Sequence, residues 1–515
     1  MLALPDLSVR RAFYAMAMVL PAIALGLSAC TVGPNYVKPE TEIEMPDEWE
    51  RSVTEEMSSD TLQLELWWTR LGDTTLTSLI RRAELNNLDL ASSVARVRES
   101  RAIRGIATGG NLPNISLDGS YTRTQLSDNS PTGRISEAVN GSNDPQDSFL
   151  GGLNASWEID VFGRIRRDVE SATASLEASV EDYRDVLVTL YAEVALSYID
   201  VRTFQMRREF ATANAEGQRG SLGLTRDRFR AGLTSALDVA QAESNLAQTE
   251  AVIPILEIGL ASGLNRLAVL LGQQPGTLHE ELAVSASIPT PPDSIAVGLP
   301  VDLLRRRPDV RRAERELAAQ TAKIGVATAQ LYPSFSLFGT LSLNSQTSNE
   351  FFSSGSFGWS LVPGVRWNIF QGGKIRQLIK VETARTDQAL LAYEQSVLFA
   401  LEDVENALVA YEQERLRRDR LDAAAAASQR AVDLVRTQYL SGLTNFQNVL
   451  DSERSLFRQQ DELAESEGLV VQSLIVLNKA LGGGWPEKDQ RAEIARNAQE
   501  EDLAGETADT AGGSQ

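Results

Sequence analysis

Two acidic residues, Glu158 and Asp160, come nearest to a catalytic pair in this sequence. They stand two positions apart in a segment that alternates between apolar and polar residues, so both carboxylates would lie on one face of a β-strand. Carboxylates placed in this way could act as a general acid and a general base. We favour the alternative, that they line a water-filled space, because an internal repeat described below places Asn368 and Phe370 at the matching positions.

Other catalytic groups are scarce. Cys30 is the only cysteine and His279 the only histidine, which nearly excludes Ser-His or Cys-His dyads and the usual zinc ligand sets. The chain of 515 residues carries a net charge of -21, which opposes binding to nucleic acid. Catalysis by carboxylates alone stays open on composition. Taking this together with the family resemblance given below, we predict that the protein is not an enzyme and has no catalytic residues, no metal site, no cofactor and no nucleic-acid partner.

The first 29 residues have the layout of a secretory signal peptide. Arg10 and Arg11 precede an apolar run that Pro21 interrupts. A membrane-spanning anchor is the alternative, and it usually needs about 20 apolar residues. The run ends in Leu-Ser-Ala before Cys30, which resembles the lipobox of bacterial lipoproteins. That resemblance implies cleavage before Cys30, covalent lipid on this residue and, with Thr31 following, sorting to the outer membrane.

The rest of the chain is duplicated, which constrains its architecture more than any local motif. Residues 105–119 (GIATGGNLPNISLDG) match residues 325–339 (GVATAQLYPSFSLFG) at seven of fifteen positions, with an offset of 220. Further on the offset is 210, where Trp157 matches Trp367. The first half therefore has about ten extra residues, which we place in the Ser/Asn/Asp/Gly-rich stretch 127–148 and predict to be a loop.

Each half contains two segments of alternating polarity, at about 113–125 and 148–161, and at about 333–345 and 356–370. Period two over about ten residues is typical of outer-membrane strands. A soluble sandwich is the alternative, but only four such segments occur, and their apolar face carries residue types that favour membrane interfaces: Tyr121, Trp157, Trp359 and Trp367. Pro363 predicts a bulge or bend in the last strand. The polar face would line a lumen with Asp118, Glu158, Asp160, Arg366 and Asn368.

Two long proline-free segments, 164–230 and 374–440, predict helices on the order of 100 Å long. Shorter helices are expected at 235–271 and 445–481. Their apolar residues recur every seven positions, which predicts supercoiled packing: Val239, Leu246, Ile253, Leu260 and Leu267, and Val449, Leu456, Leu463, Val470 and Leu477. Small or polar companions in the second of these helices suit a face turned to water or to a close neighbour: Ser452, Gln459, Ser466, Ser473 and Ala480.

The strand count requires an oligomer if the sheet lies in a membrane. Four strands cannot close a barrel, and an open sheet edge has no hydrogen-bond partner in the bilayer. Two copies would give eight strands with a filled interior, whereas three would give twelve and leave a lumen. The helices, which we expect to be too long and too hydrophilic to enter the bilayer, would form a second tube. The predicted fold is mixed α and β, a trimeric outer-membrane barrel continued by a helical coiled-coil barrel.

These residues resemble the outer membrane factors, the family of TolC and OprM, and among them the NodT-type lipoproteins of RND tripartite efflux systems. The resemblance covers about residues 27–485 and rests on Cys30 with the TVGPNY segment that follows, on residues 302–311 (DLLRRRPDVR) and on duplicated Gly-Leu-Thr turns. It implies a lipid-anchored homotrimer in the outer membrane that serves as a gated, passive exit duct for small molecules, as in multidrug resistance. Its partners would be a periplasmic adaptor (membrane fusion protein), an inner-membrane RND pump and outer-membrane lipid.

The same resemblance assigns roles at the far ends of the helical hairpins. The two turns would contact the adaptor through Gly232, Leu233, Thr234, Gly442, Leu443 and Thr444. The periplasmic gate would consist of Asp238, Tyr439, Asn448 and Asp451. Asn448 and Thr444 replace an aspartate and an arginine of TolC, so we expect a gate that is less tightly locked. A purely structural role is the alternative, since glycine turns and acids at helix starts are common.

The predicted domain map starts with the signal peptide (1–29) and a lipidated N-terminal segment with an equatorial region (30–72). The first repeat (73–272), a linker (273–299) and the second repeat (300–484) follow, and a disordered tail (485–515) ends the chain. A periplasmic adaptor is the other class considered, but it would show one helical hairpin within β-rich flanks. The basic run from Arg305 to Arg315 is expected to be a solvated face with a helix start at Pro308 and Asp309, and anion binding is the alternative.

Overall fold

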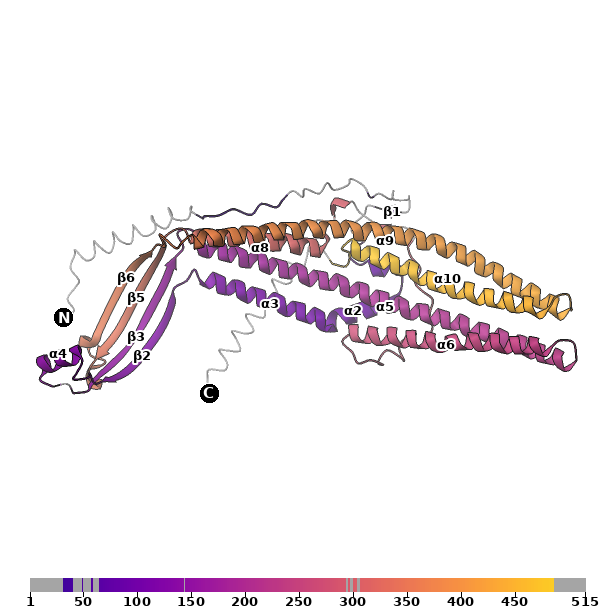
Figure 1. Cartoon of the computed structure of the whole chain (residues 1–515), viewed down its shortest axis with the longest axis horizontal. Coiled ribbons are helices and arrows are strands. Elements are labelled where there is room, and N and C mark those ends of the chain that lie inside the picture. Colours follow the sequence, from indigo (N-terminus) through magenta and orange to yellow (C-terminus); the bar gives the residue numbers. More distant parts are fainter. Residues whose placement is uncertain are drawn as a thin grey trace. The chain divides into compact units, whose positions relative to one another are not determined.

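The computed structural model of this chain describes residues 31–39, 49, 57–58, 64–142, 144–292, 295–296, 300–302 and 306–485. The signal peptide, Cys30 and the tail after Trp485 lie outside the described residues. The chain forms two compact units (Figure 1). We call them the sheet unit (Met1–Glu40, Arg98–Ala178 and Glu314–Ala392) and the helical unit (Thr41–Val97, Ser179–Ala313 and Tyr393–Gln515).

The sheet unit contains one antiparallel sheet of four strands in the order β2-β3-β5-β6 (Figure 1). Their bounds are Asn114–Thr124, Gln146–Ile159, Ser334–Ser345 and Phe357–Arg366. Each repeat supplies one hairpin, and β3 pairs with β5 to join the two repeats. Within the sheet β2 and β6 pair on one side only, so both are edge strands.

The register places the predicted apolar residues on a single face. Leu117 lies opposite Leu153, Leu153 opposite Leu341, and Leu341 opposite Trp359, so one row crosses all four strands. On the other face Asp118 accepts hydrogen bonds from Ser116 and from the Asn154 amide, at 3.0 and 2.6 Å. The register confirms the alternation. Side chains of the edge strands β2 and β6 are largely exposed and those of β3 and β5 are mostly half-buried, so no element that the structure describes covers the apolar face fully.

Of the bulge or bend expected at Pro363, the bulge is absent, so that part of the prediction was wrong. Pairing between β5 and β6 keeps one register from Ser334 opposite Arg366 to Leu343 opposite Phe357, and Pro363 lies directly opposite Leu337. An edge strand tolerates proline where the missing N–H would point to the free edge. The strand also ends at Arg366, so Asn368 and Trp367 lie beyond it rather than within it.

The stretch predicted as a loop at 127–148 contains a helix, α4 (Pro131–Asn140). Local signals explain it: the Ser130 hydroxyl accepts a hydrogen bond from the Gly133 N–H at 3.0 Å, and Pro131 occupies the first turn. Gly141 ends the helix in a left-handed conformation. These caps were overlooked in the sequence because the composition of the stretch is typical of a loop. The helix lies at the same end of the sheet as the β5–β6 connection, which contains η4 (Ser348–Glu350) and η5 (Ser354–Ser356).

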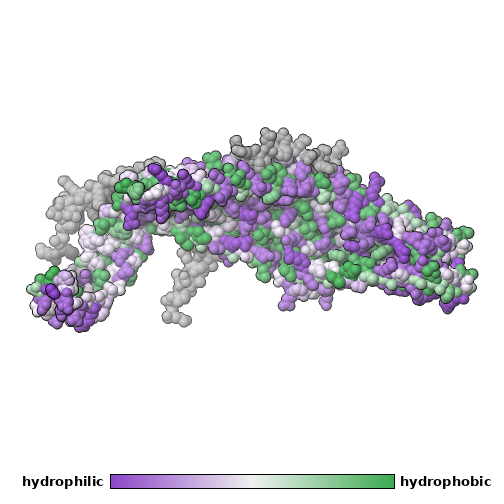
Figure 2. All heavy atoms as spheres, in the orientation of Figure 1, coloured by the Kyte–Doolittle hydropathy of each residue, from purple (hydrophilic) through white to green (hydrophobic). Residues whose placement is uncertain are grey.

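Two long helices, α5 (Arg164–Arg230) and α9 (Lys374–Leu440), follow the two hairpins with the bounds expected from the sequence. Each turns back into a shorter helix, α6 (Ala236–Leu270) or α10 (Phe446–Ala480). The heptad residues of α10 are all buried, and so are Ser466 and Ala480, which means that part of the small companion face packs against a neighbour. Figure 2 shows hydrophobic residues among hydrophilic ones on the visible side of the helices.

The remaining elements precede these hairpins or connect them. Helices α2 (Thr74–Asn86) and α3 (Leu88–Gly109) lead into the first hairpin, and α8 (Pro308–Ala329) leads into the second. The short elements are η2 (Trp67–Leu71), η3 (Pro300–Asp302) and a two-residue parallel bridge between β1 (Met57–Ser58) and β4 (Ile295–Ala296).

One helix departs from the expected hydrophilicity. By length and composition alone α6 could cross a membrane, since its most apolar window has a mean hydropathy of 1.4. That window is 28% buried. Its pairing with α10 accounts for part of this burial. The expectation that the helices are too hydrophilic for a bilayer therefore does not hold for the composition of α6.

The basic run is an ion-paired surface rather than a solvated one, which corrects the sequence expectation. Within the helical unit Arg311 pairs with Glu181 at 2.7 Å and Arg312 pairs with Asp182 at 2.8 Å. Residue Arg307 is buried and is described with the site below. Helix α8 does start at Pro308 with Asp309 in its first turn, as expected. Periodicity could not show that α5 presents an acidic row at matching spacing.

The two faces of the sheet predict opposite tolerance to charge. Leu341→Arg, in the middle of the apolar face, is expected to cost about 2–4 kcal/mol if that face meets lipid, and to reduce the amount of folded protein in membranes. The matched control is Thr340→Arg, at the same height on the polar face, which should accumulate nearly as the parent does. Equal accumulation of both variants, measured by immunoblot of membrane fractions, would refute the assignment of the faces.

Candidate functional site at the helical tips

The two hairpin tips are built from the duplicated Gly-Leu-Thr turns. Gly232 and Gly442 both have a φ of 73°, which a residue with a side chain rarely adopts. The N–H groups of Leu233 and Leu443 donate to the carbonyls of Arg228 and Gln438, both at 2.9 Å, closing the last helical turn of each long helix. Both leucine side chains remain mostly exposed, Leu233 at 66% and Leu443 at 79%. Each tip thus presents one apolar side chain on a rigid reversal.

The predicted gate acid Asp238 caps the start of α6. Ser235 and Asp238 exchange backbone and side-chain hydrogen bonds at 3.3 Å in a capping box, and the Thr234 hydroxyl donates to the same carboxylate. In the second tip Asn445 replaces serine as the cap, and the Asn448 amide donates to the Thr444 hydroxyl at 2.7 Å. These side chains therefore hold their own turns, which is the structural role weighed from the sequence.

The other two predicted gate residues differ in environment. Asp451 is exposed and accepts a hydrogen bond from the Gln447 amide at 3.0 Å. Tyr439 is 4% exposed and belongs to a hydrophobic cluster between α5, α6, α9 and α10, in which it meets Phe446 at 5.4 Å between ring centroids. The structure does not bring Tyr439 and the acids together by any hydrogen bond among the described residues.

Arg228 links the two tips, and the sequence analysis missed it. Its guanidinium lies 4.7 Å from the centre of the Tyr439 ring and donates to the Tyr439 carbonyl at 3.1 Å. A longer contact of 3.5 Å reaches the Leu440 carbonyl. A cation at these last carbonyls of α9 also complements the helix dipole. Arg228 therefore ties the end of α5 in the first repeat to the end of α9 in the second.

A second connection lies further along the same helices. The buried Glu453 of α10 accepts hydrogen bonds from Arg436 of α9 at 2.9 Å and from the Ser221 hydroxyl of α5 at 2.5 Å. Arg436 also donates to the Gly217 carbonyl of α5 at 3.1 Å. Beside it is a hollow of about 310 Å³, whose lining includes Gly217, Gly220, Leu224 and Leu440. Three helices thus meet at one buried carboxylate.

A comparison of the two repeats could have pointed to Arg228. Arg228 corresponds to Gln438 in the second tip, so only the first tip has a cation four positions before its glycine. Arg436, in contrast, corresponds to another arginine, Arg226. Which carbonyls Arg228 would reach depends on the packing of the two repeats. The sequence alone does not contain that information.

The acidic pair at the end of β3, Glu158 and Asp160, has a local function. Arg164 donates to both oxygens of Glu158, at 2.9 and 2.8 Å. Asp160 lies just after β3 and accepts from the Arg166 backbone N–H at 2.8 Å. Both carboxylates thus bind the first turn of α5, which does not support an acid and base pair. Of the other predicted lumen residues, Asp118 and Arg366 lie on the polar face of the sheet, and Asn368 lies beyond its end.

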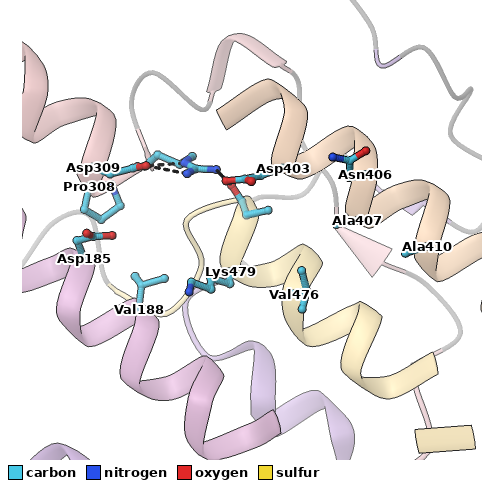
Figure 3. A pocket seen from close by; sticks show the side chains of 12 residues that line it. Asp185, Val188, Pro308, Asp309, Asp403, Asn406, Ala407, Ala410, Val476 and Lys479 are labelled. Atoms are coloured by element: carbon cyan, nitrogen blue, oxygen red, sulfur yellow. Dashed lines mark hydrogen bonds and ion pairs between the residues drawn. The ribbon is translucent and has the colours of Figure 1, made fainter. Parts of the chain in front are cut away.

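Figure 3 shows a pocket of about 420 Å³ in the helical unit, between α5, α8, α9 and α10. On one side Arg307 bonds to Asp309 at 2.7 Å, to Asp403 at 2.9 Å and to the Ala480 carbonyl at 3.2 Å. Asp185 faces the pocket from α5, and Lys479 from α10 (Figure 3). Charged side chains of both signs thus line this pocket, and Arg307 is the residue that bonds across it.

Ionisation of two of these carboxyls is shifted in opposite directions. Burial raises the pKa of Asp185, and the negative charge of Asp309 raises it further. The positive charges of Arg312 and Lys479 act to lower that pKa but do not offset the increase. Burial also acts to raise the pKa of Asp309, but the hydrogen bonds and charge of Arg307, the Val310 N–H and the charge of Arg312 together outweigh it and lower that pKa. No group of three or more His, Cys, Asp or Glu able to hold a metal occurs among the described residues.

Comparison with known proteins defines the class. The profile of the outer membrane efflux protein family matches residues 79–273 and 299–483. Nodulation protein T of Rhizobium leguminosarum bv. trifolii is 33% identical over 466 residues, covering 90% of this chain and 97% of that protein. The pyoverdine export outer membrane protein OpmQ of Pseudomonas aeruginosa is 31% identical, with 93% and 98% covered. The solved outer-membrane channel OprN superposes with a TM-score of 0.78 at 34% identity, covering 88% of this chain and all of that one.

The fold and these similarities define a channel-forming protein of the outer membrane. The chain belongs to the outer membrane efflux protein family. This confirms the resemblance, the mixed α and β class and the efflux function predicted from the sequence. The family and its structural neighbours are channels rather than enzymes.

Arg228→Ala should loosen the connection between the tips. It removes a charged donor and a cation–π contact, together about 2 kcal/mol, so we expect larger single-channel conductance and greater sensitivity of cells to bulky antibiotics. Arg230→Ala is the matched control, because Arg230 is two residues away and its one ion pair among the described residues is with the exposed Asp227. Identical conductance of both variants would contradict the linking role.

Replacement of Asp185 should reveal the effect of its burial. Because its pKa is raised in the folded state, the charged carboxylate costs stability at neutral pH, and Asp185→Asn should raise the melting temperature there. The gain should shrink as the pH falls through the raised pKa, since the parent is then protonated. Asp182→Asn, which breaks pairs with Arg96 and Arg312, should lower the melting temperature at neutral pH. A lower melting temperature for both would show that the Asp185 charge stabilises the fold.

Proposed function

We propose that three copies of this chain form the exit duct of a tripartite efflux pump, with the sheet unit in the outer membrane and the helical unit in the periplasm. The observation that carries this is the amphipathic four-stranded sheet with two open edges, β2 and β6. It needs partners on both edges, because backbone groups in hydrocarbon must be hydrogen-bonded. The strands of this sheet alternate in direction, so β6 of one copy would meet β2 of the next in antiparallel orientation.

The number of copies follows from the barrel interior. Eight strands enclose a space that side chains fill, whereas about twelve leave an aqueous channel. The polar face of the sheet, with Asp118, Asn154 and Thr340, would then line that channel. Passive export of small molecules through it requires no catalytic group and no cofactor in this chain.

Apolar side chains on the helices support contacts between copies. Within the sheet unit, Ile103 and Ile106 of α3 and Leu391 of α9 are each more than half exposed. The repeat relates α3 to α8 and α9 to α5. Because α5 and α8 pair within one chain, α9 and α3 of adjacent copies would pair in the corresponding way. Burial of these apolar residues would favour assembly in water.

The lipid anchor remains part of this proposal. Cys30 lies outside the described residues, and the support for its lipidation is the signal-like segment that ends on it. Several acyl chains at this position would hold the copy at the membrane stably. They would anchor the protein in addition to the barrel.

The tips are the proposed contact with a periplasmic adaptor, which would connect the duct to an inner-membrane RND pump. The exposed Leu233 and Leu443 offer apolar side chains at the ends of two rigid turns, and the hollow lined by Gly217 and Gly220 lies further along α5. Small apolar knobs of this kind suit a helical partner whose own side chains pack around them.

The same tips would form the gate. Asp238 and Asp451 carry charge near the ends of the tube, and three-fold symmetry would bring like charges close together. The contacts described above change the roles proposed for the other two gate residues. Tyr439 would contribute by holding Arg228, whereas Asn448 would stabilise its own turn. A resting gate held by Arg228 and by the Glu453 connection is weaker than one that also has a second aspartate ring.

Charged replacement of the tip leucines tests the function. The double variant Leu233→Asp, Leu443→Asp should abolish export of a fluorescent pump substrate, because aspartate at an apolar contact must be desolvated without a partner. Both residues are exposed, so the trimer should persist by native mass measurement. The matched control is Leu233→Met, Leu443→Met, which keeps an apolar side chain and should export at the parental rate.

Two results would contradict the proposal at different levels. Export by the aspartate variant at the parental rate would exclude the tips as the adaptor contact. A parent protein that remains monomeric in detergent and under crosslinking would exclude the shared barrel itself.

A further inference from the structure

We propose that the buried guanidinium of Arg167 is the docking site for the N-terminal segment of the same chain, Thr31–Pro39, which we call the strap. Docking of the strap would join the two repeats beside the sheet and fix the position of the residue that precedes Thr31. This goes beyond the proposed function, and it depends on that function only for its consequence at the membrane.

Arg167 makes its contacts mainly with the strap. Its Nε donates to the Val32 carbonyl at 3.1 Å, and its Nη2 donates to the Gly33 carbonyl at 3.2 Å and to the Asn35 side-chain oxygen at 2.7 Å. The remaining contact, from Nη1, is with Glu170 at 2.7 Å. The Arg167 side chain is only 3% exposed. Without the strap three hydrogen bonds to a buried cation would be lost, each worth more than an ordinary hydrogen bond.

Glycine residues leave room for the path of the strap. Gly33 has a φ of 90°, and a Cβ added to it would lie 2.4 Å from the Cα of Gly325 in α8. A Cβ on Gly325 would in turn lie 2.7 Å from the Arg167 side chain, and one on Gly163 would lie 2.7 Å from Thr31. Three glycines therefore leave space that the strap and the arginine fill. This close packing indicates a specific binding site for the strap rather than a chance surface contact.

The far end of the strap is held by the second repeat. The Tyr36 ring packs against Ala174 of α5 and Ala318 and Ala319 of α8. Its hydroxyl donates to Glu314, and the guanidinium of Arg315 lies 5.6 Å from the ring centre. The strap therefore contacts α5 from one repeat and α8 from the other.

The duplication provides an internal comparison. Gly105 corresponds to Gly325, but a Cβ there would meet nothing within 4 Å among the described residues. Gln377 corresponds to Arg167 and is exposed. Gly105 lies on α3 and Gln377 on α9, the helices proposed to pair between copies, so a neighbouring copy would supply the contacts at that junction. The buried arginine and the occupied glycine occur together, at the junction that the strap covers.

Docking has a consequence for the proposed lipid. Consecutive Cα atoms are about 3.8 Å apart, so a docked Thr31 limits how far a lipid on the preceding residue can lie from it. The Val32 N–H donates to the Phe162 carbonyl at 3.1 Å, and the Phe162 ring stacks on Tyr332 at 4.7 Å. Tyrosine favours a membrane interface. Arg167 would thus be a positioning residue that holds the acyl chains beside the barrel.

Cleavage by chymotrypsin after Tyr36 tests the docking in the full-length protein in detergent. Tyr36 is held in the docked strap, so the parent should be cut slowly. Loss of the Asn35 side chain removes one charged hydrogen bond and should speed cleavage about ten-fold, and Arg167→Ala should speed it further. Gln377→Ala, at the matching place in the other repeat, should be cut at the parental rate.

The readouts separate this inference from the proposed function. Asn35→Ala keeps Arg167 and guards against a variant that simply fails to fold. Faster cleavage of Asn35→Ala and Arg167→Ala with parental labelling by radioactive palmitate supports the strap. Cleavage of both variants at the parental rate overturns it, whether or not the parent is trimeric or exports substrate. Equal acceleration by Gln377→Ala would also overturn it, because the effect would then not be specific to the strap.

Discussion

The requirement that every backbone N–H and C=O in hydrocarbon has a partner determines most of this architecture. One chain supplies four strands and leaves β2 and β6 with a free edge each, so the sheet is complete only between copies. The long helices then have to start from strands that are fixed around a closed ring. The bidentate contact of Arg164 with Glu158, and the bond from Asp160 to the start of α5, hold the angle at which one long helix leaves its strand.

Ionic contacts organise the helices more than the heptad pattern suggested. Arg307, Arg311 and Arg312 of one basic run each meet carboxylates on neighbouring elements. Glu453 joins three helices further along from the tips. Buried ion pairs add little net stability compared with apolar packing, but removal of one partner is costly. These pairs therefore select one alignment of long helices that could otherwise slide along an apolar seam.

Much of the fold could be predicted because the relevant patterns are local. Alternation revealed the strands, and proline-free stretches ending in Gly-Leu-Thr revealed the long helices. The caps of α4 were equally local, but they lie in a stretch whose composition is typical of loops. Pro363 was misjudged because its tolerance depends on β6 being an edge strand, which is a property of the sheet order. Arg228 and Arg167 were missed for a related reason, since their partners are backbone carbonyls of segments distant in sequence.

The helix α4 makes the two halves of the duplicated sheet unequal. The first hairpin carries a capped helical turn of ten residues, whereas the second has only short 3-10 turns at the same end. A segment with its own caps at the end of a hairpin can lengthen or change without disturbing the strand register. This helix is therefore a segment where an insertion such as an epitope tag should leave the four-stranded sheet intact.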